Sequence, residues 1–227
     1  MTAPARLPVV VLLSGRGSNL RALAERAATG HLPIEIRAVV SDRPESAGLA
    51  WAGSRGLPTA ALRPADYPDR ESYDRALGEL VESFGPRLVV LAGFMRILGA
   101  VFVDRFAGRM LNIHPSLLPR HRGLHTHRRV LEAGEREHGA SVHFVTRELD
   151  GGPVVIQARV PVLEGDDEDR LAARVLEQEH RIYPRCVGWF ATGRLQYRDG
   201  AAWLDGRPLE APLQMETLDA EDQTVAT

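Results

Sequence analysis

The sequence contains one cysteine, no lysine and no long apolar run, and each shortage excludes a class of protein. Cys186 is the only cysteine in 227 residues, so an intramolecular disulfide is excluded and a reducing cytoplasm is the expected compartment. All 28 basic residues are arginines, scattered along a chain of net charge −2, which argues against a nucleic-acid partner. No apolar stretch reaches the roughly 20 residues needed to cross a bilayer, and the N-terminus lacks a signal-peptide pattern.

The remaining pattern predicts a single α/β domain. Apolar runs of strand length alternate with segments of helical periodicity, and no linker or internal repeat interrupts the alternation. We expect a Rossmann-like, doubly wound and mainly parallel sheet, with an antiparallel addition late in the chain. The predicted domain takes in residues 1–227, with its core at about 8–209. The acidic and polar segment 215–227 lacks periodicity and is expected to be poorly ordered.

A glycine-rich turn near the N-terminus is a candidate anion site. The apolar run Pro8–Leu13 leads into Ser14–Asn19, and helical spacing follows. Free backbone N–H groups at such a helix start bind anions, and Gly17 would allow a phosphate to approach closely. The spacing is not that of a dinucleotide-binding turn, so a monophosphate is favoured. The alternative is a tight turn in which Ser18 or Asn19 only caps the helix.

Asn112 and His114 are the strongest catalytic candidates in the sequence. Pro115 is expected to end the strand that contains them, and side chains two residues apart lie on one face of a strand. An amide donor beside an imidazole suits acyl transfer, because both can act on a carbonyl oxygen that gains charge. The alternative is a polar pair that only satisfies backbone groups.

Three histidines follow this strand closely, but no metal site is expected there. His121, His125 and His127 are accompanied by no cysteine and no HExxH pattern. Capping, helix packing or solvent exposure accounts for them better.

Four segments together resemble one family. They are SGRGSN (14–19), VLAGFMRIL (90–98), LNIHPSLLPRHRGLHTH (111–127) and GASVHFVTRELDGGP (139–153). In this order and spacing they are similar to the glycinamide ribonucleotide formyltransferases of purine biosynthesis, and the resemblance extends from about Val9 to Leu209. One departure lies at His121-Arg122, where the family often has an aromatic residue or a proline, so the conformation of the 117–123 loop is left open.

The resemblance implies roles for individual residues. Catalysis is assigned to Asn112, His114 and Asp150, with the aspartate closing on the histidine, although an aspartate in a turn is more often a local cap. The expected ribonucleotide contacts are Gly17, Ser18, Asn19 and Glu179, the last at the ribose hydroxyls. The expected folate contacts are Arg70, Met95, Arg96, Ile97, Leu98, Asn112, Thr146, Arg147, Glu148, Leu149 and Asp150.

The resemblance also implies the reaction. A formyl group would pass from 10-formyltetrahydrofolate, as co-substrate, to the amine of 5-phosphoribosylglycinamide, without a metal and in a monomer or homodimer. Two further possibilities are a formyltetrahydrofolate hydrolase and a non-catalytic nucleotide-binding module of the same fold. A methionyl-tRNA formyltransferase would need a basic surface and an added carboxyl-terminal tRNA-binding domain, and neither is expected here.

Overall fold

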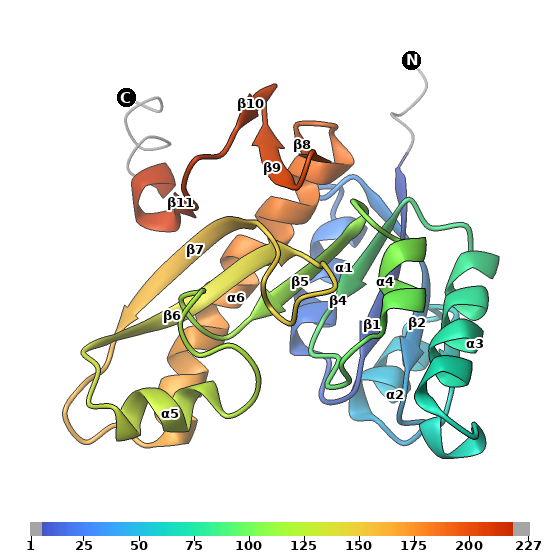
Figure 1. Ribbon diagram of the computed structural model, residues 1–227, viewed down its shortest axis with the longest axis horizontal. Helices are drawn as coiled ribbons and strands as arrows, with labels where there is room; N and C mark the ends of the chain where they lie inside the picture. Colours follow the sequence, from blue (N-terminus) through green and yellow to red (C-terminus); the bar gives the residue numbers. More distant parts are fainter. Residues whose placement is uncertain (1–5, 220–227) are drawn as a thin grey trace.

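The computed structural model describes residues 6–219, which form a three-layer α/β structure around an eight-stranded sheet (Figure 1). The strands of the sheet are β1 Leu7–Leu13, β2 Ile34–Ser41, β3 Thr59–Ala61, β4 Leu88–Leu91, β5 Met110–His114, β6 Glu137–Phe144, β7 Val154–Pro161 and β11 Leu213–Gln214. The helices are α1 Ser18–Ala28, α2 Ala47–Ser54, a 3-10 turn Pro64–Asp66, α3 Arg70–Ser83, α4 Ala100–Arg105, α5 Thr126–Glu132 and α6 Glu168–Ala191. A small separate sheet contains β8 Leu195–Arg198, β9 Ala201–Leu204 and β10 Arg207–Pro208.

The strand order, β11-β7-β6-β5-β4-β1-β2-β3, confirms the predicted doubly wound fold with a late antiparallel addition. Strands β3, β2, β1, β4 and β5 are parallel, whereas β6 pairs antiparallel with both β5 and β7. The chain reverses its winding between β1 and β4. In open sheets of this type, ligands bind at the carboxyl ends of the strands at such a switch point.

The sheet separates two apolar cores. Strands β1 and β4 are apolar at nearly every position because both of their faces are covered. On one face they pack with α1 and α6 through residues such as Leu23 and Ile182. On the other face they pack with α3 and α4 through Leu77 and Phe102. This double burial makes the sheet a rigid support for the loops at its edge.

The long helix α6 is fixed to the sheet beneath the candidate site. Its fully buried Tyr183 places its hydroxyl 2.9 Å from the carbonyl oxygens of both Leu91 and Leu111. These two residues lie on β4 and β5. The anchor therefore joins the two strands whose carboxyl ends present the candidate catalytic residues.

Some elements differ from the sequence expectation. Helix α4 was not predicted, and neither was β11. Residues 215–219, in the segment expected to be poorly ordered, form a helical turn in which Met215 is buried and Asp219 pairs with Arg181. Residues 220–227 of that segment lie outside the described residues.

No helix within residues 6–219 is both long and apolar enough to span a membrane.

Candidate functional site

Asn112, His114 and Asp150 meet at the carboxyl end of β5. The strand ends at His114, where Pro115 interrupts the ladder, and both polar side chains lie on the same face. Asp150 arrives from the turn between β6 and β7, with its backbone in the left-handed conformation (φ 47°). Its Oδ2 atom lies 3.5 Å from His114 Nδ1 and accepts a hydrogen bond of 2.9 Å from the Gly123 N–H. The turn residue thus lies beside the imidazole.

His143 belongs to the same cluster and was missed in the sequence. It lies on β6 directly opposite Asn112, and its buried ring receives the Asn112 amide at 3.1 Å on Nε2. Its Nδ1 lies 2.9 Å from the Phe144 carbonyl oxygen, so Nδ1 donates and Nε2 accepts. The same Nε2 lies 3.6 Å from Asp150 Oδ1. The available signal was a histidine between two apolar residues, Val142 and Phe144, near the end of the strand.

Burial sets the protonation of the cluster. Burial lowers the pKa of His114 below its ordinary value, although the charge of Asp150 and the His121 carbonyl oppose this effect. For Asp150 burial raises the pKa, but its neighbours His143, His114 and the Gly123 N–H together lower it below its ordinary value. At neutral pH the cluster therefore combines a charged aspartate with a neutral imidazole.

The cluster opens into an apolar cavity of about 430 Å³. Its lining includes segment 93–97 after β4, together with the catalytic candidates and Leu124 and Leu149. Met95, Ile97 and Leu124 are 55 to 61% exposed, an unusual exposure for large apolar side chains. Such a mouth suits a flat heterocycle that covers apolar surface.

Most of the residues expected at the folate line this cavity or a smaller adjoining one of about 80 Å³. Arg70 lies outside both linings: its guanidinium donates to the Ile97 carbonyl oxygen at 2.5 Å. Buried Asp74 accepts a hydrogen bond of 2.7 Å from the Gly99 N–H. Two residues of α3, Arg70 and Asp74, therefore hold the loop that follows β4. The expected residues in the linings are Met95, Arg96, Ile97, Leu98, Asn112, Thr146, Arg147, Glu148, Leu149 and Asp150.

A second cavity, of about 700 Å³, contains the glycine-rich turn. Its lining includes residues 15–19 and Glu179, and it shares Gly93, Met95, Ile113, Pro115 and His127 with the first cavity. The two cavities are therefore neighbouring lobes of one cleft, which we call the folate lobe and the ribonucleotide lobe. They meet between the ends of β4 and β5.

The turn at the start of α1 leaves its backbone open to this lobe. Gly17 has φ 74°, and a Cβ there would lie 2.8 Å from the Gly48 Cα of α2. Glycine is required at this position both for its conformation and for the close approach of α2. Ser14 connects the turn to the folate lobe, since its hydroxyl accepts the Met95 N–H at 2.8 Å.

A buried polar pair forms the floor of the ribonucleotide lobe. Asn19 Nδ2 donates to Glu179 Oε2 at 2.6 Å, while Asn19 Oδ1 has no hydrogen-bond partner among the described residues. Burial raises the pKa of Glu179 to about 7, and the Asn19 hydrogen bond opposes this rise. A carboxylate and an unpaired amide oxygen in one cavity can both accept hydrogen bonds from hydroxyl groups.

The loop between β5 and α5 folds over the folate lobe. His121 and His125 both have positive φ, at 53° and 57°. His121 bonds to Glu135, His127 Nδ1 lies 3.0 Å from His138 Nε2, and His125 precedes α5. Among residues 6–219, no group of three or more His, Cys, Asp or Glu side chains could hold a metal ion.

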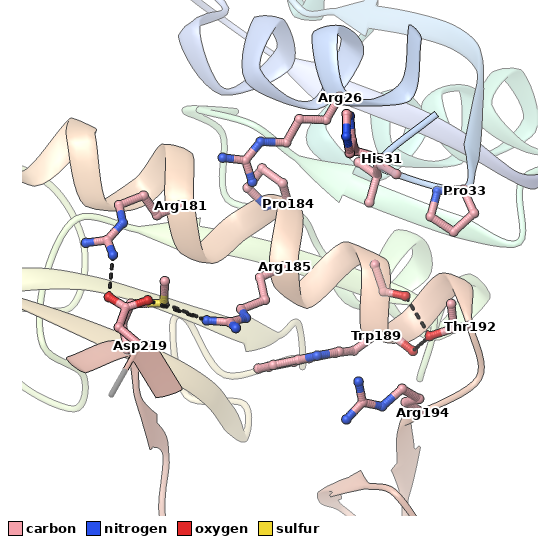
Figure 2. A pocket seen from close by; sticks show the side chains of 13 residues that line it. Arg26, His31, Pro33, Arg181, Pro184, Arg185, Trp189, Thr192, Arg194 and Asp219 are labelled. Atoms are coloured by element: carbon pink, nitrogen blue, oxygen red, sulfur yellow. Dashed lines mark hydrogen bonds and ion pairs between the residues drawn. The ribbon is translucent and has the colours of Figure 1, made fainter. Parts of the chain in front are cut away.

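Another cavity, of about 750 Å³, lies along the carboxyl-terminal half of α6, near the start of β2 (Figure 2). Arginines and the Trp189 indole line it. Arg181 and Arg185 reach Asp219, and Arg194 is paired with Asp205 at 2.7 Å. Its lining includes none of the candidate site residues, so it is separate from the two-lobed cleft.

Comparisons with known proteins show which family the chain belongs to. The family model described as formyl transferase matches residues 7–187. The phosphoribosylglycinamide formyltransferase of Escherichia coli (strain K12) is 54% identical over 201 residues, covering 88% of this chain and 95% of that protein. The solved phosphoribosylglycinamide formyltransferase of Coxiella burnetii has 47% identity and a TM-score of 0.87, covering 92% of this chain and 99% of that one. The formyltetrahydrofolate deformylase of Burkholderia mallei is 28% identical with a TM-score of 0.79, covering 88% of this chain and 70% of that one.

Proposed function

This chain belongs to the formyl transferase family, and from that premise we propose that it transfers the formyl group of 10-formyltetrahydrofolate to the amine of 5-phosphoribosylglycinamide. The products are formylglycinamide ribonucleotide and tetrahydrofolate, in purine biosynthesis. The observation that carries the proposal is the two-lobed cleft, in which a phosphate-type turn and a mouth for a flat heterocycle meet beside Asn112, His114 and Asp150.

The ribonucleotide lobe binds the acceptor substrate. The 5′-phosphate accepts hydrogen bonds from the free N–H groups at the start of α1, and it lies beside Gly17, Ser18 and Asn19. Glu179 accepts hydrogen bonds from the ribose hydroxyls, which replace solvent at this buried carboxylate. The glycinamide arm then points toward the junction of the two lobes.

The folate lobe binds the formyl donor. Its pterin ring covers the apolar side chains of segment 95–98 and the backbone of 146–150. The half-exposed Arg70 guanidinium stands outside the lobe, where it can reach the glutamate carboxylate of the folate. The formyl carbon is then held close to the acceptor amine, which supplies the proximity component of catalysis.

The amine is the nucleophile, so no serine or cysteine is required. Its nitrogen attacks the formyl carbon, and the carbonyl oxygen becomes an oxyanion that Asn112 and His114 stabilise by hydrogen bonds. The amine then loses a proton, the bond from the formyl carbon to N10 of the folate breaks, and N10 takes up a proton. Asp150 orients His114 and favours its protonated form.

Several features extend the proposal beyond the reaction. The substrates are small molecules, and we expect a monomer or homodimer that needs neither nucleic acid nor a membrane. Cys186 is buried and free, as suits an enzyme of the reducing cytoplasm.

A two-substrate absorbance assay for tetrahydrofolate formation tests the function. Turnover is expected only when both ligands are present. The deformylase alternative needs only water as the acceptor and gives no role to the ribonucleotide lobe. Tetrahydrofolate released at the same rate without ribonucleotide would support that alternative, and binding without turnover would support a non-catalytic module.

A further inference from the structure

The two nitrogens of the His114 ring have different partners. Nδ1 lies 3.5 Å from the Asp150 carboxylate, whereas Nε2 lies 3.0 Å from the backbone carbonyl oxygen of His121. A carbonyl oxygen can only accept a hydrogen bond, so Nε2 must carry a proton in this arrangement. The proton that His114 gains or loses during a reaction is therefore the one on Nδ1, beside Asp150, and it is this N–H of the protonated ring that donates to the oxyanion.

The position of that carbonyl depends on an energetically unfavourable backbone conformation. His121 has φ 53°, a left-handed conformation that side chains other than glycine adopt at a cost of about 1 kcal/mol or more. Such a residue keeps its conformation only when its surroundings hold it. The question is which contacts hold His121.

Glu135 supplies the main contact. Its Oε1 atom lies 2.6 Å from His121 Nε2, and its Oε2 accepts a hydrogen bond of 2.8 Å from Arg120. Glu135 itself is tied to α5, because its backbone N–H donates to the Val130 carbonyl oxygen. The His121 and Glu135 side chains are only 13 and 23% exposed, so solvent competes weakly for this hydrogen bond.

Two further contacts hold the neighbouring residues instead. The Ser116 hydroxyl donates to the Arg120 carbonyl oxygen at 2.7 Å, and Arg129 donates to the Arg122 carbonyl oxygen at 2.7 Å. These two contacts hold the residues on either side of His121 and not its side chain. The Glu135 carboxylate is thus the group that fixes the His121 side chain, and through it the carbonyl that faces His114. Neither His121 nor Glu135 lines the two lobes of the cleft formed by residues 6–219.

We propose that Glu135 and His121 are positioning residues for His114. Glu135 holds the His121 side chain, the His121 carbonyl keeps a proton on Nε2 of His114, and Nδ1 is left as the atom that exchanges its proton. The proposal rests on the proposed formyl transfer, for which His114 is the catalytic imidazole. It also gives a structural meaning to the histidine that stands where the resembling family often has an aromatic residue or a proline.

The test compares Glu135→Ala with Glu135→Gln. Loss of the carboxylate should lower kcat roughly 10- to 100-fold, as a misplaced catalytic group does, while both KM values stay within about twofold. Glutamine keeps a side-chain oxygen for the His121 ring N–H, so Glu135→Gln should recover most of the rate. His121→Ala should reproduce the loss if Glu135→Ala folds poorly.

Two variants serve as matched controls. Arg120→Ala removes the other ion pair of the same carboxylate, and Glu137→Ala removes a carboxylate two residues away that pairs with Arg159 at 3.0 Å. Both should retain a kcat near that of the unaltered enzyme. A loss in Arg120→Ala equal to that in Glu135→Ala would mean that the carboxylate only stabilises the loop, which overturns the proposal.

Nitrogen-15 NMR of the His114 ring provides a readout that needs no substrate. The unaltered protein should show a protonated Nε2 in the neutral ring, and Glu135→Ala should show a mixture of both tautomers. An unchanged tautomer in Glu135→Ala, or a wild-type kcat, would refute the positioning role. Because this measurement is independent of turnover, it separates failure of the proposal from failure of the proposed function.

Discussion

The pKa values of two carboxylates in the cleft are shifted in opposite directions, although burial raises both. Asp150 accepts a hydrogen bond from the Gly123 N–H and lies beside two histidines, and its pKa falls below the ordinary value even though burial acts the other way. For Glu179 the Asn19 amide is the one side-chain donor among residues 6–219, and burial raises its pKa to about 7. The neighbouring groups, rather than burial alone, decide which carboxylate is charged. Each therefore gives a separate prediction.

The Asp150→Asn variant removes a charge and keeps the shape. Its remaining oxygen can still accept the Gly123 N–H, so the turn should persist. The imidazole loses the group that favours its protonated form, and kcat should fall by roughly 10² to 10⁴ with modest changes in either KM. Steady-state kinetics measure this loss.

NMR titration of His114 is the companion measurement for Asp150→Asn. The pKa of His114, already lowered by burial, should fall further once the opposing charge is gone. A near-wild-type rate, or a titration that does not move, would make Asp150 only a turn residue.

Glu179→Gln should stabilise the empty protein at high pH. The pKa of Glu179 in the folded protein, about 7, exceeds its ordinary value of 4.5. Between pH 4.5 and pH 7 the folded protein therefore binds one proton that the unfolded chain has lost. The stability that protonation of Glu179 contributes is complete below pH 4.5 and is lost as the pH rises through 7. At pH 8 the variant should therefore gain roughly 1 to 3 kcal/mol in the free energy of unfolding, and little at pH 4.

The same variant should bind the ribonucleotide less well. Glutamine is a weaker acceptor than a carboxylate for the ribose hydroxyls, so the KM for the ribonucleotide should rise roughly tenfold while that for the folate stays. Denaturant unfolding at pH 4 and pH 8, with kinetics, checks both effects. Equal changes in the free energy of unfolding at the two pH values would contradict a charged, buried Glu179 at pH 8. An unchanged KM for the ribonucleotide would mean that the ribose binds elsewhere.

At the scale of elements, the turn between β1 and α1 has a structural and a binding role. A side chain at Gly17 meets Gly48 and enters the path of the phosphate. Gly17→Ala should therefore lower the free energy of unfolding by about 1 kcal/mol or more and raise the KM for the ribonucleotide much more than that for the folate.

Gly30→Ala is the control for Gly17→Ala. Gly30 follows the same helix with φ 80°, but a Cβ there would meet nothing within 4 Å. Gly30→Ala should lower the free energy of unfolding, because alanine is strained at a positive φ, and it should leave both KM values unchanged. If Gly17→Ala raised the two KM values equally, the turn would support the site without binding the ribonucleotide.

The elements that the sequence predicts are those whose signals are local. The strand carrying Asn112 was predicted to end near His114, and it ends there because Pro115 cannot continue the ladder. Helix α4 has only six residues, too few for a clear period, and the two-residue strand β11 depends on pairing with β7. The conformation of the 117–123 loop was left open because His121-Arg122 departs from the family, and the contact of His121 with Glu135 is not readable from the sequence.

At the scale of the whole molecule, the cleft assembles from parts that the chain keeps far apart. Asn19 and Glu179 are 160 residues apart in sequence and share a hydrogen bond of 2.6 Å. No periodicity or spacing in the sequence predicts such a contact. Only the family resemblance assigned both residues to the ribonucleotide. His143 was missed for the same reason, because its partners Asn112 and Asp150 come from other segments.

The switch between β1 and β4 explains why these parts meet. The glycine-rich turn follows β1, segment 93–98 follows β4, and Asn112 and His114 lie at the end of β5, so all three lie at the carboxyl ends of the parallel strands (Figure 1). The antiparallel β6 returns beside β5 and brings His143, and the turn after it brings Asp150. The central claim is that this single edge joins two substrates for one transfer.

The fate of an isotopically labelled formyl group tests that claim most directly. With 10-formyltetrahydrofolate carrying carbon-13 in the formyl group, and with 5-phosphoribosylglycinamide present, the label should appear as a formyl group on the former amine nitrogen of the ribonucleotide, one for each tetrahydrofolate formed. No added metal should be needed, and a chelator should not stop the reaction. Labelled formate formed at the same rate with or without the ribonucleotide would contradict the account.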